Sequence, residues 1–160
     1  MIIKNNTPMI LFRYNNYKKK DFINEHKNVL NTNDYVWMLK LGKKSSIEKI
    51  NKVKDNGGFM ILKAPKSDGG TTYIAKFSEI IGYKPNDNFY PKYYNDILNS
   101  DNYLYWDKSF QWFKIEVIKK LSEENMEKIV LINGKKPVND VIHNTMTAFM
   151  FVENSSEIKI

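Results

Sequence analysis

The residues of this chain that could bind a ligand are its tryptophans, tyrosines and lysines. Trp37, Trp106 and Trp112, together with Tyr73, could form an aromatic cage that stacks on a nucleic-acid base, while lysines hold the phosphate backbone. The alternative is that tryptophan fills the core. Because Trp37 shares a strand face with Leu39, we expect it to be a core residue.

Trp106 and Trp112 are open to both interpretations. Trp106 follows a polar, tyrosine-rich stretch. Trp112 shares a strand face with Lys114 and Glu116 rather than with Phe113. An amphipathic indole beside polar neighbours often lies at a wet site. A wet pocket and the core therefore remain alternatives for these two tryptophans.

Lysines cluster after the strand that carries Trp37. A Walker A loop is excluded, because it needs glycine where Trp37 stands and Ser or Thr where Lys44 stands. A softer possibility is an anion at the start of the helix near Ser46, where free amides and the helix dipole lie beside Lys43 and Lys44. Any capped helix offers that feature.

The residues needed for catalysis or for a metal site are sparse. The two histidines, His26 and His143, fall in different elements without a carboxylate cluster at ligand spacing. No Gly-x-Ser-x-Gly motif is present, and the absence of cysteine excludes disulfides and thiolate chemistry. We expect no catalytic role, no metal and no cofactor. An enzyme would need His26 or His143 within hydrogen-bond reach of a carboxylate in a cleft.

The positive charge is unevenly distributed along the chain. Residues 1–60 hold 12 Lys/Arg against 5 Asp/Glu, whereas residues 61–160 hold 13 of each, so the whole excess of +7 lies in the first 60 residues. Such asymmetry favours an anionic partner, although the single arginine among the 25 basic residues also fits a compositional bias. No apolar run is long enough to span a bilayer. We expect a cytoplasmic protein without a membrane partner.

The hydrophobic pattern predicts strands and helices in irregular order. Strands are expected at 9–14, 35–41, 59–64, 71–81, 110–121 and 148–153. Helices are expected at 21–30 and 45–58, the second with a Ser45–Glu48 capping box and stopped by Gly57 and Gly58, and shorter helices at about 91, 122 and 137. Neither regular βαβ alternation nor a pure β pattern results. We predict an α+β fold: a small curved sheet or a small mixed β-barrel, flanked by short helices.

The order of these elements resembles the PUA-like superfamily, and within it EVE and YTH-type domains. Trp37-Met38-Leu39-Lys40 is similar to the opening strand of those domains. Gly58 to Leu62, and then Ile74, Ala75 and Phe77, are similar to their next strands. The resemblance implies one domain over residues 1–160, with a PUA-like core at about 35–153 and an N-terminal strand–helix extension at 1–34.

The resemblance also implies a binding module. EVE and YTH-type domains enclose a modified or flipped-out base of DNA or RNA in an aromatic-walled cleft beside a basic surface, and some are sensors in restriction or other defence systems. Position by position, Lys40 and Trp37 match the motif of those domains, and the other candidates come from residue type and placement alone. We expect a nucleic-acid-binding module that uses the following residues: Lys40, Lys43, Lys44, Lys63, Trp37, Tyr73, Trp106 and Trp112. The alternative is a protein–protein adaptor or inhibitory subunit, for instance of a defence system, that does not bind nucleic acid.

Overall fold

A computed structural model gives the structure of the chain. It describes residues 1–64, 70–99, 110–145 and 147–160. The chain divides into two compact units. The first unit comprises Met1–Asn15, Ile47–Lys76 and Ile118–Ile160. The second unit comprises Asn16–Ser46 and Phe77–Val117.

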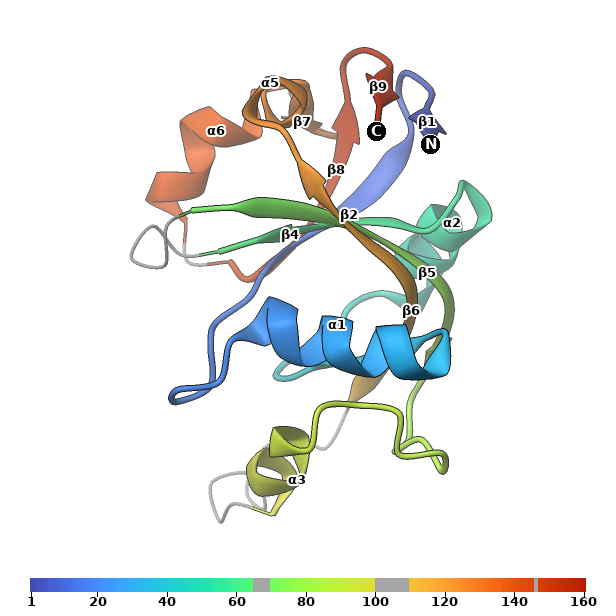
Figure 1. Cartoon of the computed structure of the whole chain (residues 1–160). Coiled ribbons are helices and arrows are strands. Elements are labelled where there is room, and N and C mark those ends of the chain that lie inside the picture. Colours follow the sequence, from blue (N-terminus) through green and yellow to red (C-terminus); the bar gives the residue numbers. More distant parts are fainter. Residues whose placement is uncertain (65–69, 100–109, 146) are drawn as a thin grey trace. The chain divides into compact units, whose positions relative to one another are not determined.

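Strands and short helices alternate irregularly along the chain (Figure 1). The strands are β1 (Ile2–Ile3), β2 (Pro8–Arg13), β3 (Val36–Lys40), β4 (Phe59–Lys63), β5 (Thr72–Ile81), β6 (Gln111–Leu121), β7 (Ile129–Leu131), β8 (Phe149–Asn154) and β9 (Ile158–Lys159). The helices are α1 (Phe22–Asn33), α2 (Ile47–Asp55), α3 (Tyr93–Leu98), α5 (Glu123–Met126), α6 (Val138–Val141) and the 3-10 helix η2 (Ile142–Asn144). The α+β prediction is therefore confirmed.

The β-barrel prediction is wrong. Seven strands form one sheet in the order β3-β6-β5-β4-β2-β8-β7, and the terminal strands β3 and β7 do not pair to close it. The segment that the sequence placed in an N-terminal extension supplies β2, which pairs in parallel with β4 and antiparallel with β8. A mixed sheet with these pairings needs partners more than 130 residues apart, such as Leu11 and Met150.

Hydrogen bonds from other groups occupy both open edges of the sheet. In the second unit, the outward amide of Trp37 on β3 donates to the carbonyl of Phe89 at 2.8 Å, and that of Leu39 donates to the Tyr94 hydroxyl at 3.3 Å. In the first unit, the amide of Leu131 on β7 donates to the carbonyl of Lys136 at 2.8 Å. A strand whose edge amides are already bonded has little to offer another strand, which explains why the sheet stays open.

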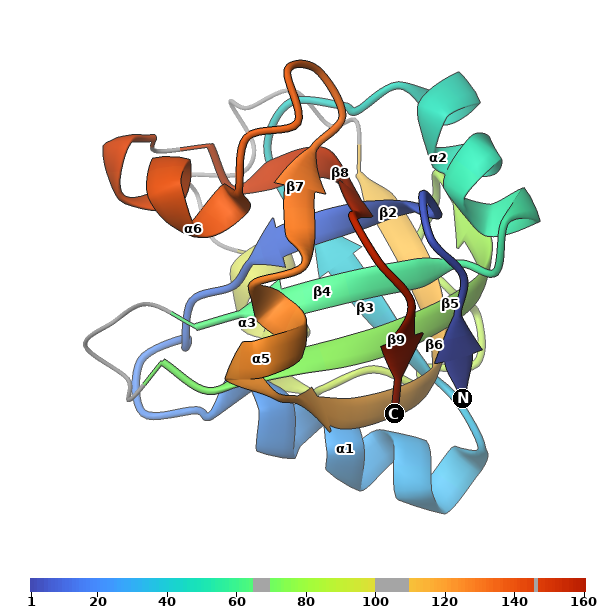
Figure 2. The same ribbon diagram turned by 90° about the horizontal axis from the view of Figure 1, so that it is seen from above.

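In the first unit, β2, β4 and β8 run side by side, which both ribbon views show (Figures 1 and 2). Side chains of one face of these strands form an apolar core with the C-terminal elements. The main core residues are Met9, Leu11, Ile61, Ile74, Met126, Ile129, Val138, Ile142 and Val152. Burial of this surface is the dominant favourable contribution to folding of the unit.

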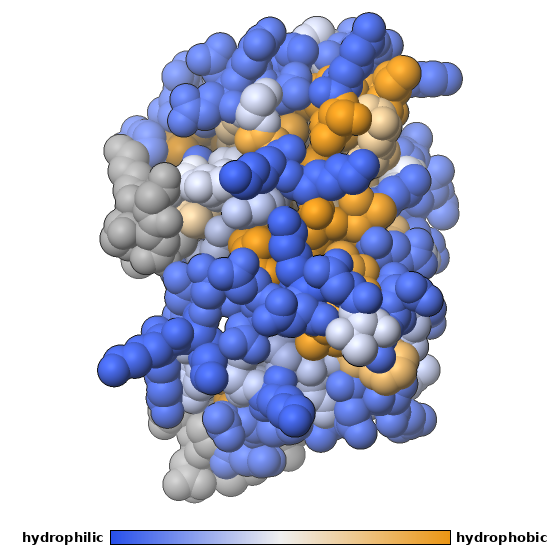
Figure 3. Space-filling model, in the orientation of Figure 1, coloured by the Kyte–Doolittle hydropathy of each residue, from blue (hydrophilic) through white to orange (hydrophobic). Residues whose placement is uncertain are grey.

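The chain ends meet within the first unit. β1 and β9 pair antiparallel, and the N-terminal ammonium group donates to the carbonyl of Ile160 at 2.9 Å (Figure 2). Most of the surface drawn in Figure 3 is hydrophilic, and hydrophobic side chains gather over β1 and β9, where Ile2 is 61% exposed. Apolar atoms contribute much of any protein surface, so exposure of this kind does not by itself mark a binding site.

Helix α2 of the first unit is amphipathic and ends where the sequence predicts. Ile50 and Val53 are buried at a spacing of three, which presents one narrow apolar stripe. Gly57 and Gly58 follow with φ of 112° and 69°. These left-handed angles favour glycine, and a Cβ atom at Gly57 would lie 2.5 Å from the Phe59 ring. The helix therefore stops and the chain enters β4 directly.

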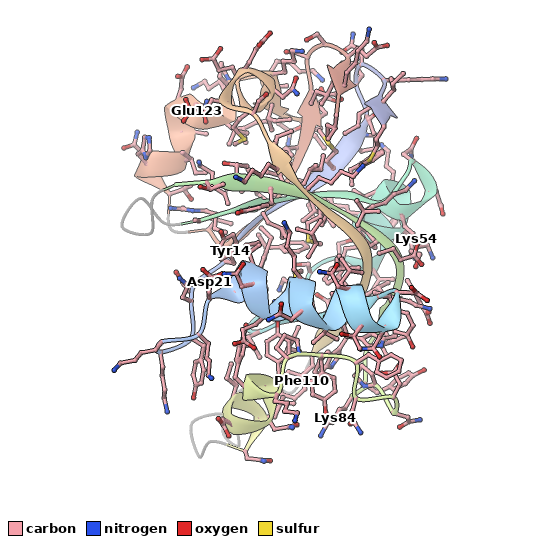
Figure 4. All side chains as sticks on the ribbon, in the orientation of Figure 1. Tyr14, Asp21, Lys54, Lys84, Phe110 and Glu123 are labelled. Carbon is pink, nitrogen blue, oxygen red and sulfur yellow. The ribbon has the colours of Figure 1, made fainter. Side chains whose placement is uncertain are left out.

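Helix α1 dominates the second unit. Asp21, labelled in Figure 4, caps its first turn by accepting a hydrogen bond from the amide of Asn24 at 2.9 Å. Asp34 ends the helix in the left-handed conformation, with φ of 67°. An aromatic core lies in the same unit, formed by Trp37, Leu39, Tyr90, Tyr93, Tyr94, Ile97 and Trp112.

Candidate functional site

Two of the predicted base-stacking residues are core residues of the second unit. Trp112 is 0% exposed, and its indole lies 5.3 Å from the Tyr90 ring and 5.8 Å from the Tyr94 ring, centroid to centroid. Trp37 is 5% exposed. The core interpretation of Trp37 agrees with this burial. For Trp112 the wet-pocket alternative does not hold, because Tyr90 and Tyr94 cover the ring.

Trp37 also has a structural partner. Its indole Nε1–H donates to the Asp87 carboxylate at 3.2 Å, and the Tyr35 hydroxyl donates to the same carboxylate. Burial alone would raise the pKa of Asp87, but these bonds and one from the Phe89 amide lower it overall. The hydrogen bond to Asp87 raises the pKa of Tyr35 to about 12. The network ties β3 to the segment that follows β5, so Trp37 is committed to the fold.

The predicted lysines after β3 differ in exposure. Lys40 is 5% exposed, its ammonium donates to the carbonyl of Lys43, and burial lowers its pKa. It therefore does not offer the surface contact to phosphate that the sequence predicts. Lys43 and Lys44 are exposed. The loop that carries them is held by Gln111, whose side chain bonds both the amide and the carbonyl of Ser45, at 3.0 and 2.9 Å.

The remaining predicted residues do not complete a cage. In the first unit, Lys63 pairs with Thr72 across β4 and β5, and its ammonium lies 3.4 Å from the Thr72 hydroxyl. Tyr73 is next along β5 and so points to the opposite face of the sheet from Lys63. Trp106 lies outside the residues that the structure describes.

A better candidate site lies in the first unit, beside α2. A groove of about 430 Å³ runs between this helix and the strands β7 and β8. We call it the α2 groove, and its lining residues are Pro8, Lys49, Lys52, Val53, Leu131, Ile132, Asn133 and Phe151. Volumes of 300–1,000 Å³ are typical of small-ligand sites.

Local sequence explains how the α2 groove is built. Lys49 and Lys52 are three residues apart on α2, so they lie on one side of the helix, while Val53 turns inward. Phe151 comes from β8, and the antiparallel pairing of Phe151 with Ile10 places it beside β2. Lys54, labelled in Figure 4, belongs to the same helix but does not line the groove.

The α2 groove combines an aromatic wall with positive charge. Phe151 is half-buried, and the ammonium of Lys49 lies 5.6 Å from its ring centroid. Lys49, Lys52 and Asn133 are exposed. No aspartate or glutamate of the described residues lines the groove. The site can therefore place an apolar ring beside an aromatic side chain, with cationic donors at the rim for an anionic group.

Among the described residues, neither histidine has the carboxylate partner that an acid–base site needs. His26 is buried; its Nδ1–H donates to the carbonyl of Phe22 at 2.7 Å, and its Nε2 accepts from the Tyr94 hydroxyl at 2.6 Å. Burial lowers the pKa of His26 to about 4. His143 is exposed on η2. Within the described parts of the chain, no three His, Asp or Glu side chains come together as metal ligands.

Comparison of the chain with family models, with curated proteins and with solved structures finds no match. The geometry of the α2 groove and the chemistry of its side chains are therefore the basis for assigning a function. None of the helices in the described ranges is long and apolar enough to cross a membrane.

The sequence carried part of the signal for the α2 groove. The helix at 45–58 and its lysines at positions 49 and 52 can be read directly, and so can the strand at 148–153. What brings Phe151 next to this helix is the pairing of β8 with β2, between residues about 140 positions apart. Periodicity in a single sequence carries no signal for a contact at that separation.

Proposed function

We propose that this protein is a nucleic-acid-binding module that holds an unpaired or flipped-out base in the α2 groove. The observation that carries the proposal is that Phe151, with the ammonium of Lys49 5.6 Å from its ring centroid, lines the groove together with Lys52, while no acidic side chain of the described residues does. A base stacked on an aromatic ring gains about 1–3 kcal/mol, which helps to offset the cost of removing it from its own stack. The two lysines would contact the flanking phosphates.

The charge of the first unit supports the same proposal. Apart from Lys49 and Lys52, exposed lysines of this unit include Lys4 and Lys136. Phosphate contacts from lysines give affinity without reading sequence, whereas the groove would select for an accessible base. Plain and modified bases of DNA or RNA are all compatible with this chemistry. The module has a binding role in this proposal and no catalytic one.

The test is fluorescence anisotropy with labelled single-stranded and double-stranded oligonucleotides, plain and base-modified, at several salt concentrations. Two phosphate contacts predict that log K falls against log salt with a slope of about −1.4 for single strands. Lys49→Ala/Lys52→Ala should abolish most of this dependence. Lys119→Ala/Lys120→Ala is the matched control, because these exposed lysines of the same unit do not line the groove.

The outcomes separate clearly. Binding at low salt that is lost in the groove variant and kept in the control supports the proposal. An absence of binding to every oligonucleotide at low salt would sink it, because phosphate contacts show there first. Equal losses in both variants would mean diffuse attraction by surface charge, and would also reject the groove as the site.

A further inference from the structure

The second unit contains a groove of its own, unrelated to the predicted cage. It has a volume of about 630 Å³ and lies between α1 and the segment 88–96. We call it the α1 groove. Its walls are side chains from residues 20–33 on one side and from residues 88–96 on the other. The function proposed for the α2 groove does not involve it.

The two walls of the α1 groove are held rigidly. Near the start of α1, the Tyr17 ring stacks on Tyr93 with centroids 5.5 Å apart. Beyond the end of α1, Tyr35 contacts Phe89 with centroids 5.3 Å apart. Segment 88–96 therefore runs antiparallel to the helix. Between these contacts, the buried His26–Tyr94 hydrogen bond fixes the segment to the inner side of α1.

The charges lining the α1 groove cancel. Lys20 and Glu25 lie on the helix wall, and Lys92 and Asp96 on the opposite wall. All four belong to the described residues, and no salt bridge forms between any two of them there. A lining of zero net charge gives no electrostatic preference for an anion or a cation. What it offers is a set of donors and acceptors of both kinds.

Side-chain amides extend this set. Asn28 is exposed on the groove wall, and its amide has no hydrogen-bond partner among the described residues. Asn88 accepts from the Tyr90 hydroxyl at 3.2 Å through Oδ1, which leaves its two N–H donors available. Asn33 donates to the carbonyl of Val29 at 3.0 Å and keeps its own oxygen as an acceptor. Val29 and Pro91 supply apolar surface between the polar groups.

We propose that the α1 groove binds a neutral, hydroxyl-rich ligand of the saccharide class. Each hydroxyl of a sugar ring both donates and accepts, which matches a lining of amides, carboxylates and ammonium groups. The C–H face of the ring suits the apolar surface of Val29 and Pro91. A groove of this size accommodates two or three sugar rings on the scale of known ligand sites. Direct hydrogen bonds, not long-range attraction, would provide the affinity.

The experiment is titration calorimetry of the full chain with maltotriose, cellotriose and triacetylchitotriose, with adenosine monophosphate as an anionic comparison. We expect at least one trisaccharide to bind, with an affinity that changes less than about twofold between low and high salt, because no net charge is involved. Asn28→Ala should weaken that binding about tenfold through the loss of one hydrogen-bonding group. Asn31→Ala is the matched control, since Asn31 is exposed on the same helix but does not line the groove.

Folding does not confound the comparison, because alanine is a better helix former than asparagine at both positions. The proposal is overturned if no trisaccharide binds, or if Asn28→Ala binds as tightly as the unaltered protein. None of these outcomes bears on oligonucleotide binding in the α2 groove, so the two proposals fail independently.

Discussion

The α2 groove and the α1 groove differ in charge more than in size. Their volumes are about 430 and 630 Å³, both within the range of small-ligand sites. Of the residues that the structure describes, two lysines and no acidic residue line the α2 groove, whereas two lysines and two carboxylates line the α1 groove. The same number of lysines therefore leads to opposite expectations: salt-dependent binding of an anion in one groove and salt-insensitive hydrogen bonding in the other.

The comparison also shows how differently aromatic residues act in the two units. The second unit buries Tyr90, Tyr94 and Trp112 in a core, where their rings contact one another. The first unit leaves Phe151 half-buried beside a lysine. An aromatic-rich sequence thus does not locate a base-binding site. What matters is whether a ring keeps a face that a ligand can reach.

Lowering the pH should produce the largest difference in stability between the two units. His26 has a folded-state pKa of about 4 against a usual 6.5, so the unfolded chain takes up its proton more readily. Its contribution to stability is complete above pH 6.5 and is lost as the pH falls towards 4, by up to roughly 3 kcal/mol. Hydrogen exchange of α1 amides at pH 7 and pH 4.5 should show this loss, while α2 amides show a smaller one.

A variant isolates the histidine from the carboxylates that also titrate. In urea unfolding, the difference in stability between pH 7 and pH 4.5 should be smaller for His26→Gln than for the unaltered protein. His143→Gln is the control, because His143 is exposed and lies in the first unit. If His26→Gln loses as much stability between pH 7 and pH 4.5 as the unaltered protein, the buried imidazole is not the cause of the acid sensitivity.

Reversing the charge of the α2 groove should have the next largest effect. Lys49→Glu/Lys52→Glu removes two phosphate contacts and adds two repulsive charges, so oligonucleotide affinity at low salt should fall about 100-fold. Anisotropy measures the loss, and calorimetry with the trisaccharides should show no change in the α1 groove. Lys43→Glu/Lys44→Glu provides the comparison with the sequence-based prediction. An equal loss of oligonucleotide affinity in that variant would mean that the loop after β3 also binds the oligonucleotide, as the sequence predicts.

Removing the aromatic wall should separate stacking from charge. Phe151→Leu retains an apolar side chain but loses the ring face, which should lower affinity for single strands about tenfold and leave the salt slope unchanged. Phe12→Leu is the matched control, since this phenylalanine is half-buried in the same unit and does not line the groove. An altered slope without a loss of affinity at low salt would contradict stacking on Phe151.

Local structure was largely predictable from the sequence. Apolar runs and glycines located β3, β4, β5 and α2 to within a few residues, because these signals depend on neighbours along the chain. The open sheet was not predictable, because it depends on bonds such as Tyr94 to Leu39 that link distant segments.

The predicted site failed for a related reason. Trp112 lies on the same face of β6 as Lys114 and Glu116, and such polar neighbours predict a face exposed to solvent. In the structure Tyr90 and Tyr94 cover that side, so the ring is buried although its neighbours are polar. A stretch read as a polar excursion supplies these tyrosines. Period two identifies the face of a strand but not what packs on it.

The smallest expected effect tests the charge comparison most directly. Glu25→Gln/Asp96→Asn removes the two carboxylates of the α1 groove and leaves Lys20 and Lys92 with the same net charge as the α2 groove. Made in the Lys49→Glu/Lys52→Glu chain, this change should raise oligonucleotide affinity by about threefold at low salt, because weak phosphate contacts become available. Trisaccharide affinity should fall in the same variant, since two acceptors lose their charge.

Glu79→Gln/Glu116→Gln, in the same unit but outside the groove, controls for net charge alone. If the control gains as much, overall charge governs the attraction; if neither gains, the ring face of Phe151 rather than the lysines distinguishes the two grooves.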